Sequence, residues 1–407
     1  MSVAVAAAVA LGLEPAAARQ APLAPGRWTT AWATSQNGLG TNTVTNTTVR
    51  MIARVTAAGD AVRIRIDNTF GTSPLVVGKA YLGQRIQGAA LAPGSRRQVL
   101  FKTASRVTVP PGGSVMSDPV AMVVLAQQDL AVTLYIPEAG VRPSQHSGAQ
   151  VTSYVAADGA GDVAADEAAT PFTGTTTSLW WVKAVEVSSS ASTGSIVMFG
   201  DSITDGTCTT LDAHDRWEDL VALRLALDAA NRGTPDAHKA VVNEGIGGNT
   251  VTRNIQPAPD SPPGTERLER DVLSHNGVTH VVIFMGTNDI RREAPAAQVV
   301  AGLQDIISRV KMRGLKAVGV TIIPRHNRPA VENNTGWNDT KTQRRLEVNR
   351  WIRTQAPLDA VIDFDAVVQD PTNAALIHPP FNCGDGIHPS PRGYFEMGRS
   401  VRLDLFR

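Results

Sequence analysis

The sequence predicts two regions of different fold class: an all-β sandwich of the jelly-roll kind, followed by an α/β region with a parallel sheet. In the first region apolar residues alternate with a period of two, as in 61–66 (AVRIRI), and no helix is convincing. In the second region buried strands alternate with amphipathic helices. The segment 188–194 (SSSASTG) separates the two patterns. We therefore expect one domain over 27–187 and another over 194–407.

The strand candidates of the first region are separated by turn signals. The candidates cover 61–66, 106–109, 120–125, 130–136 and 179–187. The turn signals are 58–60 (AGD), 92–95 (APGS) and 110–113 (PPGG). Residues 156–178 are rich in Ala, Gly, Asp and Thr and predict a long loop. Short strands at this spacing are typical of a β-sandwich or jelly roll.

The second region alternates between the two kinds of element from its first strand onward. The predicted strands cover 195–199, 240–243, 278–284, 315–323 and 360–364. The predicted helices cover 216–230, 266–275, 296–313 and 341–355, with a last helix from Pro391. This order predicts a parallel sheet that is covered by helices on both faces.

Length, composition and charge exclude several classes of protein. The 407 residues exceed one ordinary domain of about 100–200 residues. Hydrophobic residues make up 43% and charged residues 18%, so the chain can form a large core and is unlike a disordered protein. The 38 Lys and Arg nearly balance the 37 Asp and Glu. We expect no nucleic-acid partner and no membrane partner, and the oligomeric state is left open.

The amino terminus has the pattern of a secretory leader. Residues 3–13 (VAVAAAVALGL) form an apolar run that is too short to span a bilayer, which takes about 20 residues. The small residues 16–18 (AAA) suit a signal peptidase, although no cationic residue precedes the run. We expect 1–26 to be a signal-peptide-like segment with a linker, and the protein to be secreted or periplasmic. A disordered Ala-rich tail or a cloning remnant is the alternative.

Polar residues stand directly after several of the predicted strands, where ligands bind in an open parallel sheet. They belong to 200–206 (GDSITDG), 244–250 (EGIGGNT) and 286–289 (GTND), together with 385–390 (DGIHPS) before the last helix. We expect these four segments to converge on one edge of the sheet.

The four segments supply the parts that acyl transfer needs. Ser202 is the candidate nucleophile, at the predicted start of a helix. His388 is the candidate base, and Asp385, three residues earlier, can accept a hydrogen bond from its ring and fix the tautomer. The backbone N–H groups of Ser202 and Gly248 and the side-chain amide of Asn288 could bind the oxyanion.

Together, these segments resemble the four sequence blocks of the SGNH (GDSL-type) hydrolases, in the longer bacterial form with an N-terminal β-rich domain. The resemblance covers about 194–407. It implies a flavodoxin-like three-layer α/β/α fold and a serine carboxylic-ester hydrolase that acts through an acyl-enzyme without a cofactor. By block position Ser202, Asp385 and His388 are the catalytic triad, and Asn288 is an oxyanion donor. In the second block the donor is Gly248 or its neighbour Gly247.

The resemblance favours short-chain acyl or acetyl esters as substrates, either small molecules or acetylated carbohydrates. A lipase, thioesterase or aryl esterase with a larger acyl pocket is an alternative. A β-sandwich binding protein with an inactive hydrolase-like domain is another.

The remaining candidate residues have structural interpretations. We expect Asp201 and Asp289 to hydrogen-bond loops rather than react. The other histidines lack metal-ligand spacing, so we expect surface or loop roles and no catalytic metal; they are His146, His214, His238, His275, His280, His326 and His378.

Two cysteines and several aromatic residues complete the set of candidates. Cys208 follows Ser202 by six residues and Cys383 precedes Asp385 by two, so convergence of the segments predicts a disulfide. Tryptophans 28, 32, 180 and 181 are expected in the core or between the domains, with a sugar-stacking surface as the alternative. The polar stretch 327–340 is expected to be a rim loop of the substrate pocket, with Trp337 as a contact, or else a solvated loop.

Overall fold

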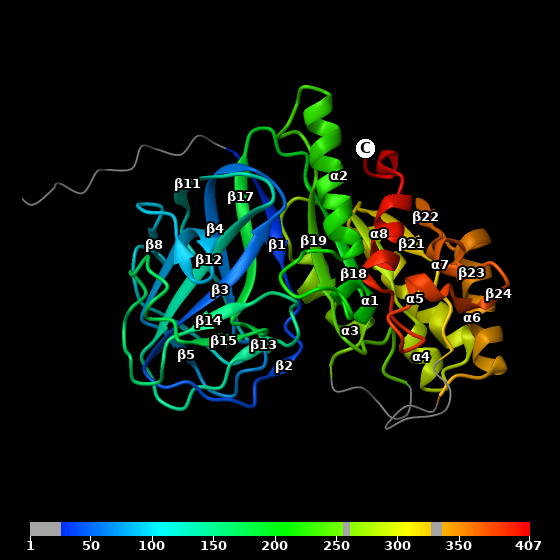
Figure 1. The fold of residues 1–407 in the computed structure, drawn as a ribbon, viewed down its shortest axis with the longest axis horizontal. Helices are drawn as coiled ribbons and strands as arrows, with labels where there is room; N and C mark the ends of the chain where they lie inside the picture. Colours follow the sequence, from blue (N-terminus) through cyan, green and yellow to red (C-terminus); the bar gives the residue numbers. More distant parts are fainter. Residues whose placement is uncertain (1–25, 255–260, 327–335) are drawn as a thin grey trace, which may run out of the picture.

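The computed structural model describes residues 26–254, 261–326 and 336–407 (Figure 1). A β-rich region, coloured blue to green, lies beside an α/β region that runs to the red carboxyl terminus. The predicted leader falls in 1–25, which lies outside the described residues. Among the helices of the described ranges, none combines the length and the hydropathy needed to cross a bilayer.

The β-rich region consists mainly of two antiparallel sheets. In the first sheet the strand order is β1 (Arg27–Ala33), β17 (Val182–Ser189), β4 (Gly59–Asp67), β10 (Ser114–Met116). A further strand, β11 (Val120–Val124), also pairs with β4. In the second sheet the order is β15 (Gly174–Thr176), β14 (Ser153–Val155), β3 (Thr47–Val55), β12 (Gln128–Ile136), β6 (Lys79–Gln87), β7 (Ala90–Leu91). A further strand, β8 (Arg97–Val99), also pairs with β6. Shorter pairings join β16 (Leu179–Trp180), β13 (Ser144–His146) and β2 (Gly38–Leu39), and join β5 (Leu75–Val77) to β9 (Val107–Val109).

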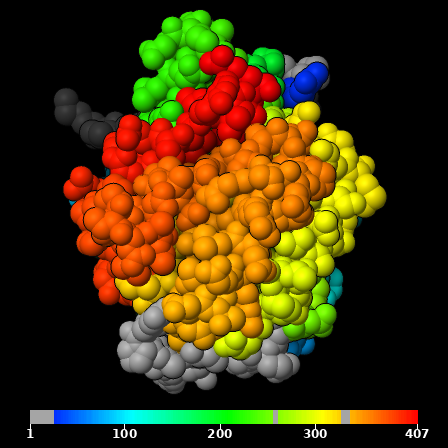
Figure 2. Space-filling view, turned by 90° about the vertical axis from the view of Figure 1, so that its right-hand side faces the viewer, coloured from blue at the N-terminus to red at the C-terminus, as the bar shows by residue number. Residues whose placement is uncertain are grey.

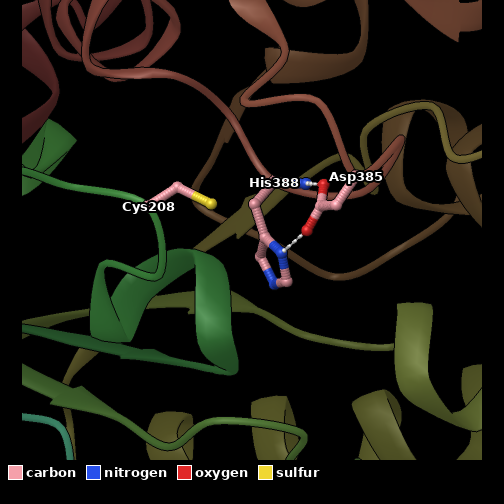
Figure 3. A group of neighbouring side chains, drawn as sticks. All are labelled: Cys208, Asp385 and His388. Atoms are coloured by element: carbon pink, nitrogen blue, oxygen red, sulfur yellow. Dashed lines mark hydrogen bonds and ion pairs between the residues drawn. The ribbon is translucent and has the colours of Figure 1, made fainter.

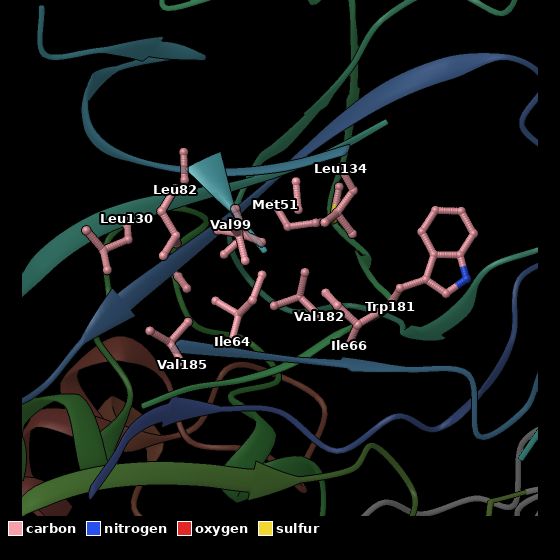
Figure 4. Packing of buried hydrophobic residues seen from close by; sticks show 14 of the residues in the cluster. Met51, Ile64, Ile66, Leu82, Val99, Leu130, Leu134, Trp181, Val182 and Val185 are labelled. Atoms are coloured by element: carbon pink, nitrogen blue, oxygen red, sulfur yellow. The ribbon is translucent and has the colours of Figure 1, made fainter. Parts of the chain in front are cut away.

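The two sheets face each other across one apolar core (Figure 4). Met51, Leu82 and Leu134 from the second sheet point toward Ile64 and Val185 from the first. All of these side chains are fully buried. The architecture is the predicted β-sandwich, in which alternating residues of both sheets form the core.

The predicted strand over 179–187 is two strands in the structure. Trp181 has a φ of 58°, in the left-handed region, and lies between β16 and β17. A β-strand requires negative φ, so pairing is interrupted at this residue. Trp180 and Trp181 are both buried and pack edge to face, which confirms the expected core position.

The α/β region contains a parallel sheet with the order β19-β18-β20-β21-β22. Its strands are β18 (Ser195–Gly200), β19 (Ala240–Gly245), β20 (Val278–Phe284), β21 (Lys316–Val320) and β22 (Ala360–Ile362). All neighbouring strands run parallel. Counted along the chain, the order is 2-1-3-4-5, which is the flavodoxin-like order. The predicted fold class is therefore confirmed.

Helices cover both faces of this sheet. One face packs against α2 (Trp217–Asn231), α7 (Phe364–Val368) and α8 (Pro391–Ser400). The other packs against α3 (Gly264–Leu268), α5 (Ala296–Met312) and α6 (Asp339–Thr354). Figure 2 looks at the side of this region that is turned away from the β-rich region, where residues from the second half of the chain form most of the surface.

Several elements differ from the sequence prediction. The predicted helix over 266–275 is α3 followed by a π-helical turn, Glu269–Leu273. The predicted strand over 360–364 ends at Ile362, because the Asp363 side chain caps α7 by accepting a hydrogen bond from the Ala366 N–H. The unpredicted elements of the α/β region are short: α4 (Thr287–Arg291), α7, the pair β23 (Gln369–Asp370) and β24 (Asn373–Ile377), and the 3-10 turns Pro379–Phe381 and Leu403–Phe406. In the β-rich region the sequence prediction also missed the longer strands β1, β3 and β6.

The two regions share a polar interface. The Thr56 hydroxyl accepts a hydrogen bond from the Val241 N–H at 2.9 Å, which ties the β-rich region to β19. Lys183 of β17 forms a buried ion pair with Asp271 of the π-helical turn at 2.6 Å. Charged groups become stable in such a buried interface only when they are paired, so these contacts fix how the two regions meet.

Candidate active site

Ser202 lies where β18 ends and the short helix α1 (Ser202–Asp205) begins. The Asp201 side chain caps this helix by accepting a hydrogen bond from the Ile203 N–H at 3.0 Å. Helix α1 packs tightly against the end of β19: a Cβ atom at Gly245 would lie 2.3 Å from the Asp205 nitrogen. This tight turn holds the Ser202 hydroxyl at the carboxyl edge of the sheet.

The Ser202 hydroxyl contacts the ring of His388. Its Oγ lies 2.8 Å from His388 Nε2, although the two residues are 186 positions apart. On the other side of the ring, His388 Nδ1 lies 2.5 Å from Asp385 Oδ2 (Figure 3). A carboxylate can only accept a hydrogen bond, so Nδ1 carries the proton. Nε2 is then free to accept the proton of the Ser202 hydroxyl.

Asp385 is held as a carboxylate by its surroundings. Burial opposes ionisation, but hydrogen bonds from the His388 ring and from the backbone N–H groups of His388 and Ile387 outweigh it and lower the pKa of Asp385 to about 2. At neutral pH this carboxylate is ionised and fixes the orientation of the imidazole.

The predicted disulfide joins Cys208 to Cys383, with a Cα–Cα distance of 6.3 Å. The Cys383 N–H also donates to the His388 carbonyl at 3.0 Å. The bond therefore ties the turn that carries His388 to the segment that follows α1. Cys208, Asp385 and His388 lie close together in Figure 3. A sulfur in a disulfide is not a thiolate, so this cluster lacks the ligand that would favour a metal.

The two glycines proposed as oxyanion donors differ in their hydrogen bonds. The Gly247 N–H donates to Asp205 Oδ2 at 2.9 Å, so it is already used. The N–H of Gly248 has no acceptor within the described part of the chain. Gly248 also has a φ of 70°, which favours glycine at this turn. Asn288 lies nearby and donates one amide hydrogen to the Asn249 carbonyl at 3.0 Å, which leaves the second hydrogen available.

Asp201 and Asp289 are buried and accept backbone hydrogen bonds: Asp201 caps α1, whereas Asp289 holds a loop, as the sequence predicted for it. Asp289 accepts hydrogen bonds from the Val251 N–H at 2.8 Å and the Thr252 N–H at 3.1 Å, which fixes the loop that follows Gly248. Burial raises the pKa of Asp289 to about 7 and that of Asp201 to about 6.

Sequence reasoning missed Arg267, whose fully buried side chain connects the loops of the site. Its guanidinium donates to the Gly200 carbonyl at 2.8 Å, to the Glu244 carbonyl at 2.9 Å and to Asn249 Oδ1 at 2.9 Å. These groups lie at the ends of β18 and β19 and beside Gly248. Burial lowers the pKa of Arg267 to about 10, so it stays charged at neutral pH. Nothing in its sequence context distinguishes it from a solvated arginine.

The expected surface or loop positions of the histidines are wrong for His146 and His280, which are buried in β13 and β20. His238 and His275 lie in loops but are also buried. Polar partners at the interface account for three of them. His146 Nε2 lies 3.0 Å from Asp205, His275 Nε2 lies 2.5 Å from Glu244, and both ring nitrogens of His238 face carbonyl oxygens.

Part of the expected rim loop, 327–335, lies outside the described residues. Trp337 is described, and only 3% of its surface is exposed. It packs in the core cluster of α5 and α6, and its indole N–H donates to Thr342 at 3.1 Å. The expectation that Trp337 contacts substrate at a rim is therefore wrong: it is a packing residue.

Part of this chain is similar to a known family and to several solved structures. Residues 198–394 match the model of the GDSL-like Lipase/Acylhydrolase family. Among solved structures, Est24, a carbohydrate acetylesterase from Sinorhizobium meliloti, is 18% identical with a TM-score of 0.40 over 52% of this chain and 96% of its own. An inhibitor-bound aryl esterase from M. smegmatis is 20% identical with a TM-score of 0.41 over 52% of this chain and 99% of its own. The search of curated proteins found no match. The α/β region of this chain belongs to the GDSL-like lipase/acylhydrolase family.

Proposed function

We propose that this acylhydrolase is a serine carboxylic-ester hydrolase in which Ser202, His388 and Asp385 form the catalytic triad. The contact between Ser202 Oγ and His388 Nε2 at 2.8 Å carries the proposal. A serine hydroxyl becomes an effective nucleophile when an oriented base stands within hydrogen-bond distance. The Asp385 carboxylate supplies that orientation from the far side of the ring.

In this mechanism the Ser202 oxygen attacks the acyl carbon of the ester, and His388 Nε2 takes the hydroxyl proton. The tetrahedral intermediate collapses when His388 gives that proton to the leaving alkoxide, so the acyl group stays bonded to Ser202. A water molecule then gives its proton to His388 and attacks the acyl-enzyme. Collapse of the second intermediate releases the carboxylic acid and returns the proton to Ser202.

The oxyanion of each intermediate needs preorganised donors. We assign these to the N–H of Ser202, the N–H of Gly248 and the side-chain amide of Asn288. The engagement of Gly247 by Asp205 favours Gly248 as the donor of its turn. Loss of one such donor typically lowers kcat by about 10²–10³-fold.

The family resemblance favours short-chain acyl or acetyl esters, including acetylated carbohydrates, as substrates. A series of p-nitrophenyl esters from acetate to long acyl chains tests this preference. A kcat/KM that falls steadily with chain length supports it. A maximum at long chains would favour the alternative of a lipase, thioesterase or aryl esterase with a larger acyl pocket.

Replacement of the nucleophile tests the mechanism. Ser202→Ala should lower turnover of p-nitrophenyl acetate by at least about 10⁴-fold, because no other group can form the acyl-enzyme. Circular dichroism should show an unchanged fold. Ser400→Ala is the control, since this exposed serine at the end of α8 donates only to the Met397 carbonyl of its own helix. Turnover by Ser202→Ala at the rate of the control would refute the assignment.

We also propose that the protein works in a secreted or periplasmic setting. The Cys208–Cys383 disulfide supports this, because such bonds persist in oxidising compartments and are rare in the cytosol. Fractionation of producing cells checks the proposal. Recovery in the cytosol with both thiols free would contradict it.

A further inference from the structure

The β-rich region reaches the candidate active site through buried polar side chains. In Figure 1 the end of this region that carries β2 and β13 lies beside α1 and α3, at the edge of the parallel sheet where the catalytic loops stand. His146 of β13 and Ser35, after β1, make the contacts. Both residues are buried.

His146 contacts the helix that carries the candidate nucleophile. Its Nε2 lies 3.0 Å from Asp205 Oδ1, and the other carboxylate oxygen, Oδ2, accepts the Gly247 N–H at 2.9 Å. Asp205 thus connects the histidine to the residue directly before Gly248. The orientation of the Gly248 N–H depends on the peptide plane that it shares with Gly247, so the position of Asp205 sets the position of this donor.

The hydrogen bonds of His146 determine its protonation. Its Nδ1 lies 2.6 Å from the Ser35 carbonyl, which can only accept, so Nδ1 carries a proton. A neutral ring would then direct the lone pair of Nε2 at the Asp205 carboxylate. Burial and the nearby Arg216 charge act to lower the pKa of His146. The charge and hydrogen bond of Asp205, together with the hydrogen bond to the Ser35 carbonyl, outweigh these effects, so the net pKa of His146 is raised. An imidazolium–carboxylate pair satisfies both nitrogens.

Ser35 links this pair to the second support of the site. Its hydroxyl accepts a hydrogen bond from Arg267 at 2.9 Å and donates to the Glu244 carboxylate. Arg267 in turn holds the Gly200 carbonyl, two residues before Ser202, and the Asn249 side chain, one residue after Gly248. The β-rich region therefore contacts the supports of both the nucleophile and the oxyanion donor.

We propose that His146 is a positioning residue for the Gly247–Gly248 turn, acting through Asp205, so that the β-rich region takes part in ester hydrolysis. This inference rests on the proposed esterase function. His146 does not touch the reacting atoms. It fixes the carboxylate that orients the oxyanion donor, and a loosened donor lowers kcat more than it changes KM, because the donor binds the transition state more tightly than the ester.

A double-mutant cycle on p-nitrophenyl acetate tests the proposal, with enzyme concentration taken from the burst of p-nitrophenol. His146→Ala should lower kcat by about 10- to 100-fold and change KM by less than about twofold, as expected for a displaced donor. Asp205→Ala should have a similar effect. The double variant should be no slower than Asp205→Ala, because His146 acts only through that carboxylate.

A matched histidine provides the control. His238 is also buried at the interface and contacts the Thr56 carbonyl at 3.1 Å, but it precedes β19 and lies at the other end of that strand from Gly248. His238→Ala should lower the melting temperature while kcat changes by less than about twofold. If His146 only held the two regions together, its replacement would behave like that of His238.

Conservative variants keep the proposal falsifiable where alanine prevents folding. In Asp205→Asn the amide oxygen can accept the Gly247 N–H and the amide nitrogen can donate to a neutral His146, so this variant should recover most of the kcat lost in Asp205→Ala. His146→Gln should fall between wild type and His146→Ala.

Two results would overturn the proposal: a kcat of folded His146→Ala within about twofold of wild type (or, where alanine prevents folding, a His146→Gln kcat no lower than wild type), or single-variant effects that multiply in the double variant. An inactive wild type, or an active Ser202→Ala, would instead refute the proposed function.

Discussion

The two regions of this chain differ in where they bury charged groups relative to the candidate site. The β-rich region encloses an apolar core between its sheets, with Val49, Ile64 and Leu134 fully buried. The α/β region has apolar layers on both faces of its sheet, but at the carboxyl edge it also buries charged groups such as Arg267, Asp271 and Asp289. Apolar burial supplies stability without direction, whereas buried charges are stable only in one geometry. The site therefore stands at a sheet edge where several buried charges meet.

The interface between the regions resembles the site more than it resembles either core. Lys183 and Glu186 of β17 are buried and pair with Asp271 and Asn276 of the α/β region. An interface of this kind is expensive to disrupt, because removal of one partner leaves the other buried and unpaired. The β-rich region is thus better described as a support of the α/β region than as a separate module.

Among the substitutions that test this difference between the regions, replacement of Arg267 should have the largest effect on stability and kcat. Arg267→Ala should lower the free energy of unfolding by about 3–5 kcal/mol, because the Gly200 and Glu244 carbonyls and Asn249 Oδ1 lose their buried donor and Asp271 loses one of its cationic partners. Its kcat should fall as well, since the Gly200 carbonyl and Asn249 lose the group that holds them. Urea denaturation and p-nitrophenyl acetate kinetics measure the two effects.

The matched control is Arg85, which pairs with Asp129 at 2.9 Å inside the β-rich region. Arg85→Ala should cost less stability and leave kcat unchanged. Arg267→Lys keeps the charge but not the planar set of donors, so it should fall between wild type and Arg267→Ala. A folded Arg267→Ala variant with wild-type kcat would show that the buried charge of Arg267 matters no more for catalysis than the Arg85 charge in the β-rich region.

This contrast also marks the limit of prediction from sequence. Ser202, Asn288, Asp385 and His388 stand out as candidates in the sequence because the carboxyl edge of a parallel sheet is a general location for ligands. His146 and Arg267 are not, because their contacts join residues far apart in the chain, such as Arg267 and Ser35 at 232 positions. No local pattern reports such a pair, and a buried histidine or arginine has the same neighbours in sequence as an exposed one.

The fold shows the same limit in its strands. The period of two identifies β4, where buried and less buried residues alternate. It does not identify β3, whose residues are nearly all buried because both faces are covered, and which contains the buried Arg50. The change from α3 to the π-helical turn is likewise invisible, since it occurs where Arg267 and Asp271 meet the interface.

The disulfide provides the next effect in size. Cys208→Ser with Cys383→Ser should lower the free energy of unfolding by about 2–4 kcal/mol, because the bond closes a long loop in the unfolded chain. The bond spans 175 residues, from Cys208 to Cys383, all of them within the α/β region. Its loss should leave kcat nearly unchanged, since the contacts among Ser202, His388 and Asp385 remain.

Urea midpoints with and without a reductant measure this effect. Reduced wild type should unfold at the same urea concentration as the double variant, and the reductant should not shift the variant. Equal midpoints for oxidised and reduced wild type would show that the bond adds nothing to stability.

The smallest effect concerns the pH dependence of stability at Asp385. Its pKa of about 2 in the folded protein lies below the ordinary value of 3.8, so its interactions stabilise the fold above about pH 4 and are lost as the pH falls through about 2. Asp385→Asn lacks this contribution at every pH. Because 37% of the side chain is exposed, we expect a difference of at most about 1 kcal/mol near pH 6 that shrinks toward zero near pH 2.

Urea denaturation of both proteins from pH 2 to 6 measures that difference. Asp60→Asn, at an exposed position of β4 in the β-rich region, is the control for an Asp-to-Asn change away from His388. A constant offset for Asp385→Asn would mean that Asp385 acts through packing. A difference that grows as the pH falls would have the opposite sign to the one that an ion pair with His388 requires, because protonation of Asp385 can only weaken that pair.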